Sequence, residues 1–154
     1  MRQGTGPSNP PDQPALDAPL PYGPPLTLKQ AKAILQAAES EAERNHWPVA
    51  IVIADASGDV VLALKRDQTQ HSSLSIATGK ALTAVNFRRP TKMFQDGIAA
   101  GGVGLRFLAV PGVTPLEGGF PLVLGGQIVG GIGVSGVLSS QDAQVARAGM
   151  DALA

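Results

Sequence analysis

The chain of 154 residues contains no cysteine and only two histidines. The absence of cysteine excludes disulfides, thiolate metal sites, iron–sulfur clusters and a cysteine nucleophile. Lysine and arginine (12) balance aspartate and glutamate (12), so the basic excess typical of nucleic-acid-binding proteins is missing. No apolar run approaches the roughly 20 residues of a membrane helix, and the N-terminus lacks the apolar segment of a secretory signal. We therefore expect no nucleic-acid partner, no membrane partner and a cytoplasmic location.

Proline and glycine are abundant, and they are segregated along the chain. Eight of the 13 prolines precede Leu26, a composition that forbids helix and favours extended backbone. We interpret residues 1–25 as an arm, either loosely draped or packed on a neighbouring subunit through Leu20, Tyr22 and Leu26. Residues 26–154 are expected to form one domain. Since aromatic residues make up only 4%, its core must be built from Ala, Val, Ile and Leu.

Hydrophobic periodicity and capping residues predict the secondary structure. Helices are expected over 27–44, 72–88 and 91–99 and from Ser139 onward, and strands over 49–54, 60–64, 105–110, 121–124 and 127–137. Thr27 with Gln30, and Ser139 with Asp142, have the spacing of N-terminal caps, and Thr91 is expected to cap the third helix. Hairpin strands with helices around them indicate an α+β fold with an antiparallel sheet of about five strands.

The last predicted strand is rich in glycine. Residues 131–136 match the GxGxxG pattern of dinucleotide-binding loops, but the pattern lies within a hairpin strand and no βαβ unit follows it. Bare backbone at Gly130, Gly131, Gly133 and Gly136 instead predicts that a helix, a second subunit or a flat ligand approaches this strand closely.

Several residues between 65 and 120 are candidates for chemistry. Seven basic residues against two acidic ones over 65–106 indicate either a solvated surface or an anion site for carboxylates or phosphates. His71, in a polar loop before the second helix, is a better candidate than His46 for an iron ligand or a proton-transfer group. Glu117, which precedes two glycines, could accept backbone hydrogen bonds or act as a general base.

Three sequence blocks resemble the GlcG/HbpS family of haem-binding-like proteins, to which the C-terminal domain of PduO-type cobalamin adenosyltransferases is related. The first block runs from Lys80 to Phe94, the second from Glu117 to Pro121, and the third from Gly126 to Ala146. The resemblance covers about 26–154. It implies a profilin-like α/β/α architecture with helices on both faces of the sheet, a bacterial origin and dimer-based homo-oligomers that bind haem or another small molecule near subunit contacts.

Two functions follow from the resemblance and the candidate residues. In the first, the protein is a haem-binding homo-oligomer acting as a carrier, sensor or accessory protein, with His71 as a possible axial ligand. In the second, it is an enzyme (an isomerase, lyase or hydrolase) for a small organic acid, with Glu117 or His71 as general base and Lys80 and Arg88 holding the carboxylate. The expected ligand-binding residues are Lys80, Phe87, Arg88, Pro90, Thr91, Phe94, Glu117, Gly118, Gly119 and Phe120.

Overall fold

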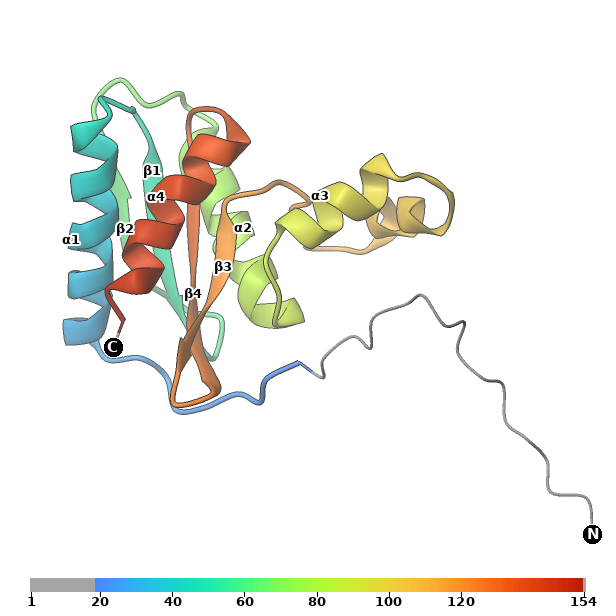
Figure 1. Cartoon of the computed structure of the whole chain (residues 1–154), viewed down its shortest axis with the longest axis horizontal. Coiled ribbons are helices and arrows are strands. Elements are labelled where there is room, and N and C mark those ends of the chain that lie inside the picture. Colours follow the sequence, from blue (N-terminus) through green and yellow to red (C-terminus); the bar gives the residue numbers. More distant parts are fainter. Residues whose placement is uncertain (1–18, 154) are drawn as a thin grey trace, which may run out of the picture.

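A four-stranded antiparallel sheet forms the centre of the molecule, in the order β2-β1-β4-β3. The computed structural model describes residues 19–153. The strands are β1 (Ala50–Asp55), β2 (Val60–Lys65), β3 (Gly119–Leu124) and β4 (Gln127–Ser135). Helices α1 (Leu28–Arg44) and α4 (Ser139–Asp151) cover one face, and α2 (Ser73–Phe87) covers the other (Figure 1). The fold is therefore α+β, with helices on both faces of the sheet as expected.

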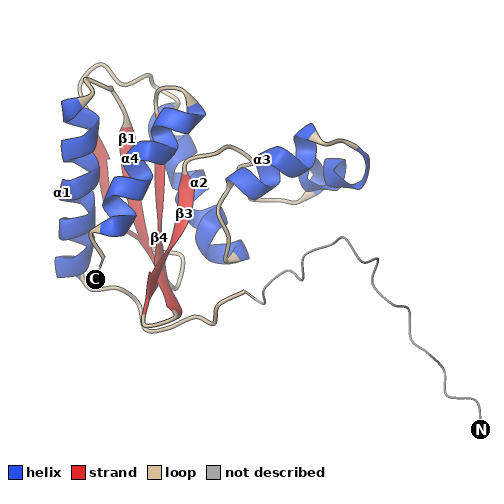
Figure 2. Ribbon diagram, in the orientation of Figure 1, coloured by secondary structure: helices blue, strands red, loops and turns tan. Residues whose placement is uncertain are grey.

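Helix α3 (Lys92–Ala99) and a 3-10 helix, η1 (Gly102–Ala109), lie outside these three layers. They pack against each other and project away from the sheet, to the right in Figure 1. We call residues 92–110 the projecting unit. Figure 2 shows that it contains no strand. Among the described residues, no helix combines the length and apolarity that crossing a membrane would require.

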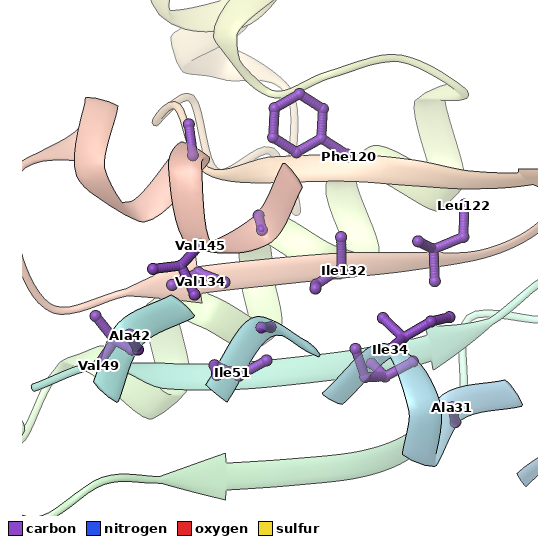
Figure 3. Packing of buried hydrophobic residues seen from close by; sticks show 14 of the residues in the cluster. Ala31, Ile34, Ala42, Val49, Ile51, Phe120, Leu122, Ile132, Val134 and Val145 are labelled. Atoms are coloured by element: carbon purple, nitrogen blue, oxygen red, sulfur yellow. The ribbon is translucent and has the colours of Figure 1, made fainter. Parts of the chain in front are cut away.

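The core is divided between the two faces of the sheet because side chains alternate along a strand. Ile51 and Ile53 of β1 point toward α1 and α4, whereas Val52 and Ala54 point toward α2, and all four are fully buried. Figure 3 shows the larger cluster, in which Ile34 of α1 and Val145 of α4 pack against the sheet. The small residues of the α2 layer let that helix lie close to the strands.

The glycine-rich strand β4 has the role that its composition predicts. An added Cβ on Gly131 would lie 2.7 Å from Ala81 O, and one on Gly133 would collide with Ala77 O. Helix α2 therefore rests directly on the bare backbone of β4. The preceding turn also needs glycine, because Gly125 and Gly126 both have positive φ, as a two-residue hairpin turn requires.

The predicted strand over 105–110 is wrong, and with it the count of five strands. These residues belong to η1 and the turn that follows, and they have no strand beside them. Gly101 and Gly102 turn the chain with positive φ where η1 begins, so the apolar run is directed into the projecting unit. The apolar run alone suggested a strand, but a strand exists only where a partner accepts its backbone hydrogen bonds.

The helix ends partly differ from expectation. Thr27 and Gln30 form the predicted capping box of α1. Thr91 makes no side-chain cap on α3. At α4 the residue before the helix is Leu138, whose N–H donates to Gln141 Oε1 at 3.2 Å. The Ser139–Asp142 cap is therefore wrong, and Asp142 is directed into the interior instead.

The described part of the arm, residues 19–25, lies along the domain of its own chain. Ile128 N donates to Pro21 O, Gly23 N donates to Ile128 O, and Leu26 N donates to Val129 O, at 2.8–3.0 Å. Leu26 is buried in the main core. Residues 1–18, the remainder of the predicted arm, lie outside the described residues.

Candidate functional site

Lys80 lies at the centre of a buried polar cluster that links three elements. Its side chain is almost fully buried, and its Nζ donates to Val134 O at 2.8 Å and to Asp142 Oδ2 at 3.1 Å. Burial lowers the pKa of Lys80, against the opposing effects of Asp142 and Glu117, and burial also raises the pKa of Asp142. The ammonium thus joins α2, β4 and α4, and its donors are directed into the protein rather than toward solvent.

Three of the expected ligand-binding residues, Thr91, Gly118 and Gly119, pack around this cluster. Gly119 N donates to Thr91 Oγ1 at 2.9 Å, and Thr91 N donates to Gly119 O at 3.0 Å. An added Cβ on Gly118, where φ is +125°, would lie 2.9 Å from Lys80 Nζ. The two glycines are therefore needed because the start of β3 touches α2 and the Lys80 ammonium.

Glu117 stands at the rim of the cluster and is half-buried. Its backbone N–H donates to Gln95 Oε1 at 2.9 Å, which ties it to α3. The pKa of Lys92 is raised first by its hydrogen bond to Asp96 and further by the charge of Glu117. The charge of Glu117 also acts on Lys80, where it opposes the effect of burial on the pKa.

Aromatic rings form a second cluster at the junction of α2 and α3. Phe94 is buried and stands edge-on to Phe87, with ring centres 5.2 Å apart, and to Phe107 of η1, with ring centres 5.0 Å apart. Pro90, in the loop between the two helices, is half-exposed. This cluster joins the end of α2 to the two helices of the projecting unit.

The surface of the projecting unit is strongly apolar. Val103 is 82% exposed and Leu108 is 68% exposed. Met93, Leu105 and Val110 are exposed as well, and none of the eight described residues of η1 is buried. Exposed apolar side chains concentrated in one short segment are typical of a place where a ligand or a protein partner binds.

Two arginines follow Phe87 at the base of the projecting unit. Arg88 has a left-handed backbone (φ 55°), and its guanidinium lies over the ring of Tyr22, 5.4 Å from the centroid. Arg89 Nε donates to Phe87 O at 3.2 Å. Both residues are half-exposed, and they follow Phe87 of the aromatic cluster directly in the chain.

Other predicted site residues lie elsewhere. Phe120 belongs to the core cluster on the α1 and α4 side of the sheet (Figure 3), whereas α2, which ends at Phe87, covers the other face. Arg147 of α4 lies over the Phe120 ring at 5.2 Å. Phe120 therefore does not lie with Phe87 at the α2–α3 junction.

Both histidines are exposed and remote from the aromatic cluster. His71 lines a groove of about 570 Å³ with residues 65–70, beyond the N-terminal end of α2. His46 lines a neighbouring groove of about 550 Å³ with Glu39 and Glu43. A 15-residue helix is about 21 Å long, so His71 and Arg88 flank α2 at opposite ends. Over residues 19–153, no group of three His, Asp or Glu is placed to hold a metal ion.

The seven basic residues over 65–106 do not form one anion site. Lys80 is paired with Asp142, and Lys92 is paired with Asp96 at 2.6 Å. Arg66 NH1 donates to Trp47 O at 2.7 Å. Arg66 precedes the N-terminal end of α2, whereas Arg88 follows its C-terminal end. Three of the seven are next to residues of the aromatic cluster. Arg88 and Arg89 follow Phe87 in the chain, and the Arg106 guanidinium lies over the Phe107 ring, 5.6 Å from its centroid.

Three structurally important residues were not among the sequence-based candidates. Asp142 resembles an ordinary helix cap, and nothing local distinguishes it as the partner of Lys80. Phe107 lay in the segment predicted as a strand. Tyr22 was considered only as a possible contact to another subunit, although a single tyrosine in a proline-rich segment is a signal that the segment is anchored.

Comparison with known proteins supplies the family. Residues 26–151 match the family model described as "Haem degrading protein HbpS-like". The chain is 40% identical over 110 residues to Protein GlcG of Escherichia coli (strain K12), covering 71% of this chain and 81% of GlcG. Its structure is similar to that of a Streptomyces reticuli HbpS double mutant, with a TM-score of 0.79 and 32% identity over 96% of this chain and 99% of that one. It is also similar to a PduOC:Heme complex, with a TM-score of 0.75 and 27% identity over 83% of this chain and 94% of that one. This chain therefore belongs to the HbpS-like family.

Proposed function

We propose that this protein binds haem, or a closely related tetrapyrrole, as a homo-oligomer. The observation that carries the proposal is the exposed apolar surface of the projecting unit, rooted in the Phe87–Phe94–Phe107 cluster. The similarity of this chain to a PduOC:Heme complex and to HbpS supports haem as the ligand. A role as a carrier, sensor or accessory protein is consistent with binding that involves no chemical step.

The residues of one copy meet two of the three demands of a haem. Haem needs apolar contact for its ring, cations for its propionates and an axial ligand for its iron. The projecting unit offers Val103, Leu105 and Leu108 for the ring. Arg88, Arg89 and Arg106 adjoin this surface and would pair with the propionates.

The distance between His71 and this surface indicates how copies would cooperate. Because His71 and Arg88 flank α2 at opposite ends, one chain does not present both to the same haem. A histidine ligand would therefore come from a second copy. Such an arrangement would also cover the apolar residues of the projecting unit, which one copy leaves in water.

The geometry gives less support to an enzyme for small organic acids. That hypothesis assigns Lys80 to the substrate carboxylate. The Lys80 side chain is 2% exposed, and its Nζ already donates to Val134 and Asp142. Haem binding does not require that Lys80 be accessible to a ligand, so haem binding is the function that we favour.

A haemin titration followed through the Soret band tests the proposal. We expect a sharp, shifted band that saturates near one haem per subunit or per dimer. Replacing Val103 and Leu108 together by aspartate should abolish saturable uptake, because both side chains are exposed apolar contacts. A broad band that never saturates with the unmodified chain would contradict haem binding.

The axial ligand is tested separately with the two histidines. His71→Ala should shift the Soret maximum if His71 ligates iron, and His46→Ala is the matched control, since that histidine is equally exposed. Identical spectra for His71→Ala and the unmodified protein would exclude His71 as a ligand without affecting the proposal that haem binds.

A further inference from the structure

Tyr22 caps the C-terminal end of α2 from outside the helix. Its hydroxyl donates to Val85 O at 2.6 Å, with Asn86 O at 3.3 Å. The last carbonyls of a helix have no partner within the helix itself. A side chain from more than 60 residues earlier in the chain thus satisfies the end of the helix that leads into the aromatic cluster.

The same tyrosine also holds Arg88. At this residue the backbone has a left-handed conformation, which a residue with a Cβ adopts only when its surroundings stabilise it. The guanidinium lies over the Tyr22 ring, and its NH1 makes a long contact of 3.5 Å to Leu20 O. Tyr22 therefore contacts the helix end through its hydroxyl and the following turn through its ring.

The segment that carries Tyr22 is firmly attached on both sides of it. Pro21 O and Gly23 N both pair with Ile128, at 2.8 and 2.9 Å. An added Cβ on Gly23 would lie 2.8 Å from Gln127 Cβ, so the backbone fits closely against β4. Tyr22 itself remains 45% exposed, so its side chain spans the surface between β4 and the end of α2.

The turn held by Tyr22 sets the position of the proposed ligand site. Phe87, whose ring belongs to the aromatic cluster, immediately precedes Arg88. Arg88 N donates to Val85 O, the carbonyl that Tyr22 also contacts, and Arg89 N donates to Ala84 O. The conformation of Arg88 therefore fixes both the Phe87 ring and the direction in which the chain enters the projecting unit.

We propose that Tyr22 is a positioning residue of the ligand site: it holds the α2–α3 junction in the conformation that binds ligand. The inference rests on the proposed function, haem binding at that junction. It assigns to the described part of the arm a role in ligand affinity.

The test compares Tyr22→Ala with Tyr22→Phe in the full-length chain. The alanine variant loses both contacts and should bind haemin about tenfold more weakly, with a broadened Soret band. The phenylalanine variant keeps the ring under Arg88 and should recover part of the affinity. Arg147→Ala is the matched control, because it removes an arginine stacked on an aromatic ring on the other face of the sheet, and it should leave haemin affinity unchanged.

Amide hydrogen exchange separates failure of this inference from failure of the proposed function. Exchange at Arg88 and Arg89 should be faster in Tyr22→Ala, because both amides donate to the end of α2. If the unmodified chain binds haemin and Tyr22→Ala matches it in affinity, Soret shape and exchange, the positioning role is overturned. If the unmodified chain takes up no haem, the proposed function fails. In that case, unchanged exchange at Arg88 and Arg89 in Tyr22→Ala would also refute the inference that Tyr22 stabilises the α2–α3 junction.

Discussion

At the scale of single residues, the buried ion pair between Lys80 and Asp142 links both helical layers to the sheet. Burying two charges is costly, and leaving one of them without the other costs more. Lys80→Met or Asp142→Leu alone should each lower the free energy of unfolding by about 3–5 kcal/mol. The double variant should lose far less than the sum, because neither charge is then left unpaired.

Urea denaturation of the four proteins measures this coupling. The control is Lys92→Met, which removes the lysine of an exposed i,i+4 pair and should cost less than about 1 kcal/mol. Additive losses in the double variant would show that Lys80 and Asp142 do not act as a pair.

Glu41 makes the free energy of unfolding depend on pH in the acid range. Its carboxylate accepts from Arg44 at 2.6 Å and from Gln144 of α4 at 2.7 Å, and these hydrogen bonds lower the pKa of Glu41 from 4.5 to about 2. The folded pKa lies below the unfolded one, so this stabilisation is complete above about pH 4.5 and is lost as the pH falls toward 2. The free energy of unfolding, measured against pH, should fall less steeply over this window in Glu41→Gln. Parallel curves for the two proteins would refute the assignment.

At the scale of elements, the contact of α2 with β4 depends on missing side chains. Gly133→Ala would place a Cβ against Ala77 O, which is backbone and cannot rotate away. We expect a loss of about 1–3 kcal/mol from overpacking, measured as a lower midpoint in thermal and urea unfolding. Ala63→Val on the exposed side of β2 is the control, since it adds volume where nothing opposes it. An unchanged midpoint for Gly133→Ala would mean that α2 moves away from β4 at little cost.

The elements that could be predicted from the sequence are those whose signals are local. The capping box of Thr27 and Gln30 and the glycine turn at 125–126 act through neighbouring residues, and the structure contains both. The bare strand after the turn is visible from its composition, although the helix that approaches it comes from far along the chain. The 105–110 segment was mispredicted because its strand-like pattern depends on a partner elsewhere in the chain. Similarly, the face of the sheet reached by Phe120 depends on the register of β3 with β4, which no local pattern determines.

The candidate site shows the same division. Lys80, Thr91, Gly118 and Gly119 were all candidates and lie together in the structure, but the partner of Lys80 is Asp142, at the start of the last helix. Tyr22 and Phe107 join the α2–α3 junction through contacts that span long stretches of sequence. Long-range pairings of this kind are set by the packing of whole elements, which composition and periodicity do not report.

At the scale of the whole molecule, the projecting unit predicts self-association. Val103 and Leu108 are among the most exposed apolar side chains of the described residues, and η1 buries no side chain in its own copy. Replacing both by aspartate should therefore reduce the mass of the assembly in sedimentation velocity while leaving the far-UV circular dichroism unchanged. Val60→Asp, at an exposed position on the edge strand β2, is the control and should keep the unmodified mass. An unmodified chain that sediments as a monomer at all concentrations would refute association.

The strand order has a consequence for how this chain emerges during synthesis. The two central strands, β1 and β4, pair Ala50 with Ser135, so the middle of the sheet closes only after most of the chain has been made. The β1–β2 hairpin can form early, but Ile51 and Ile53 then lack α4, and one edge of β1 lacks its partner. Such pairings are slow to form and expose apolar strand edges in the meantime. The nascent chain therefore passes through an interval in which β1, whose residues Ala50 to Ala54 are all buried in the finished protein, is exposed to aggregation.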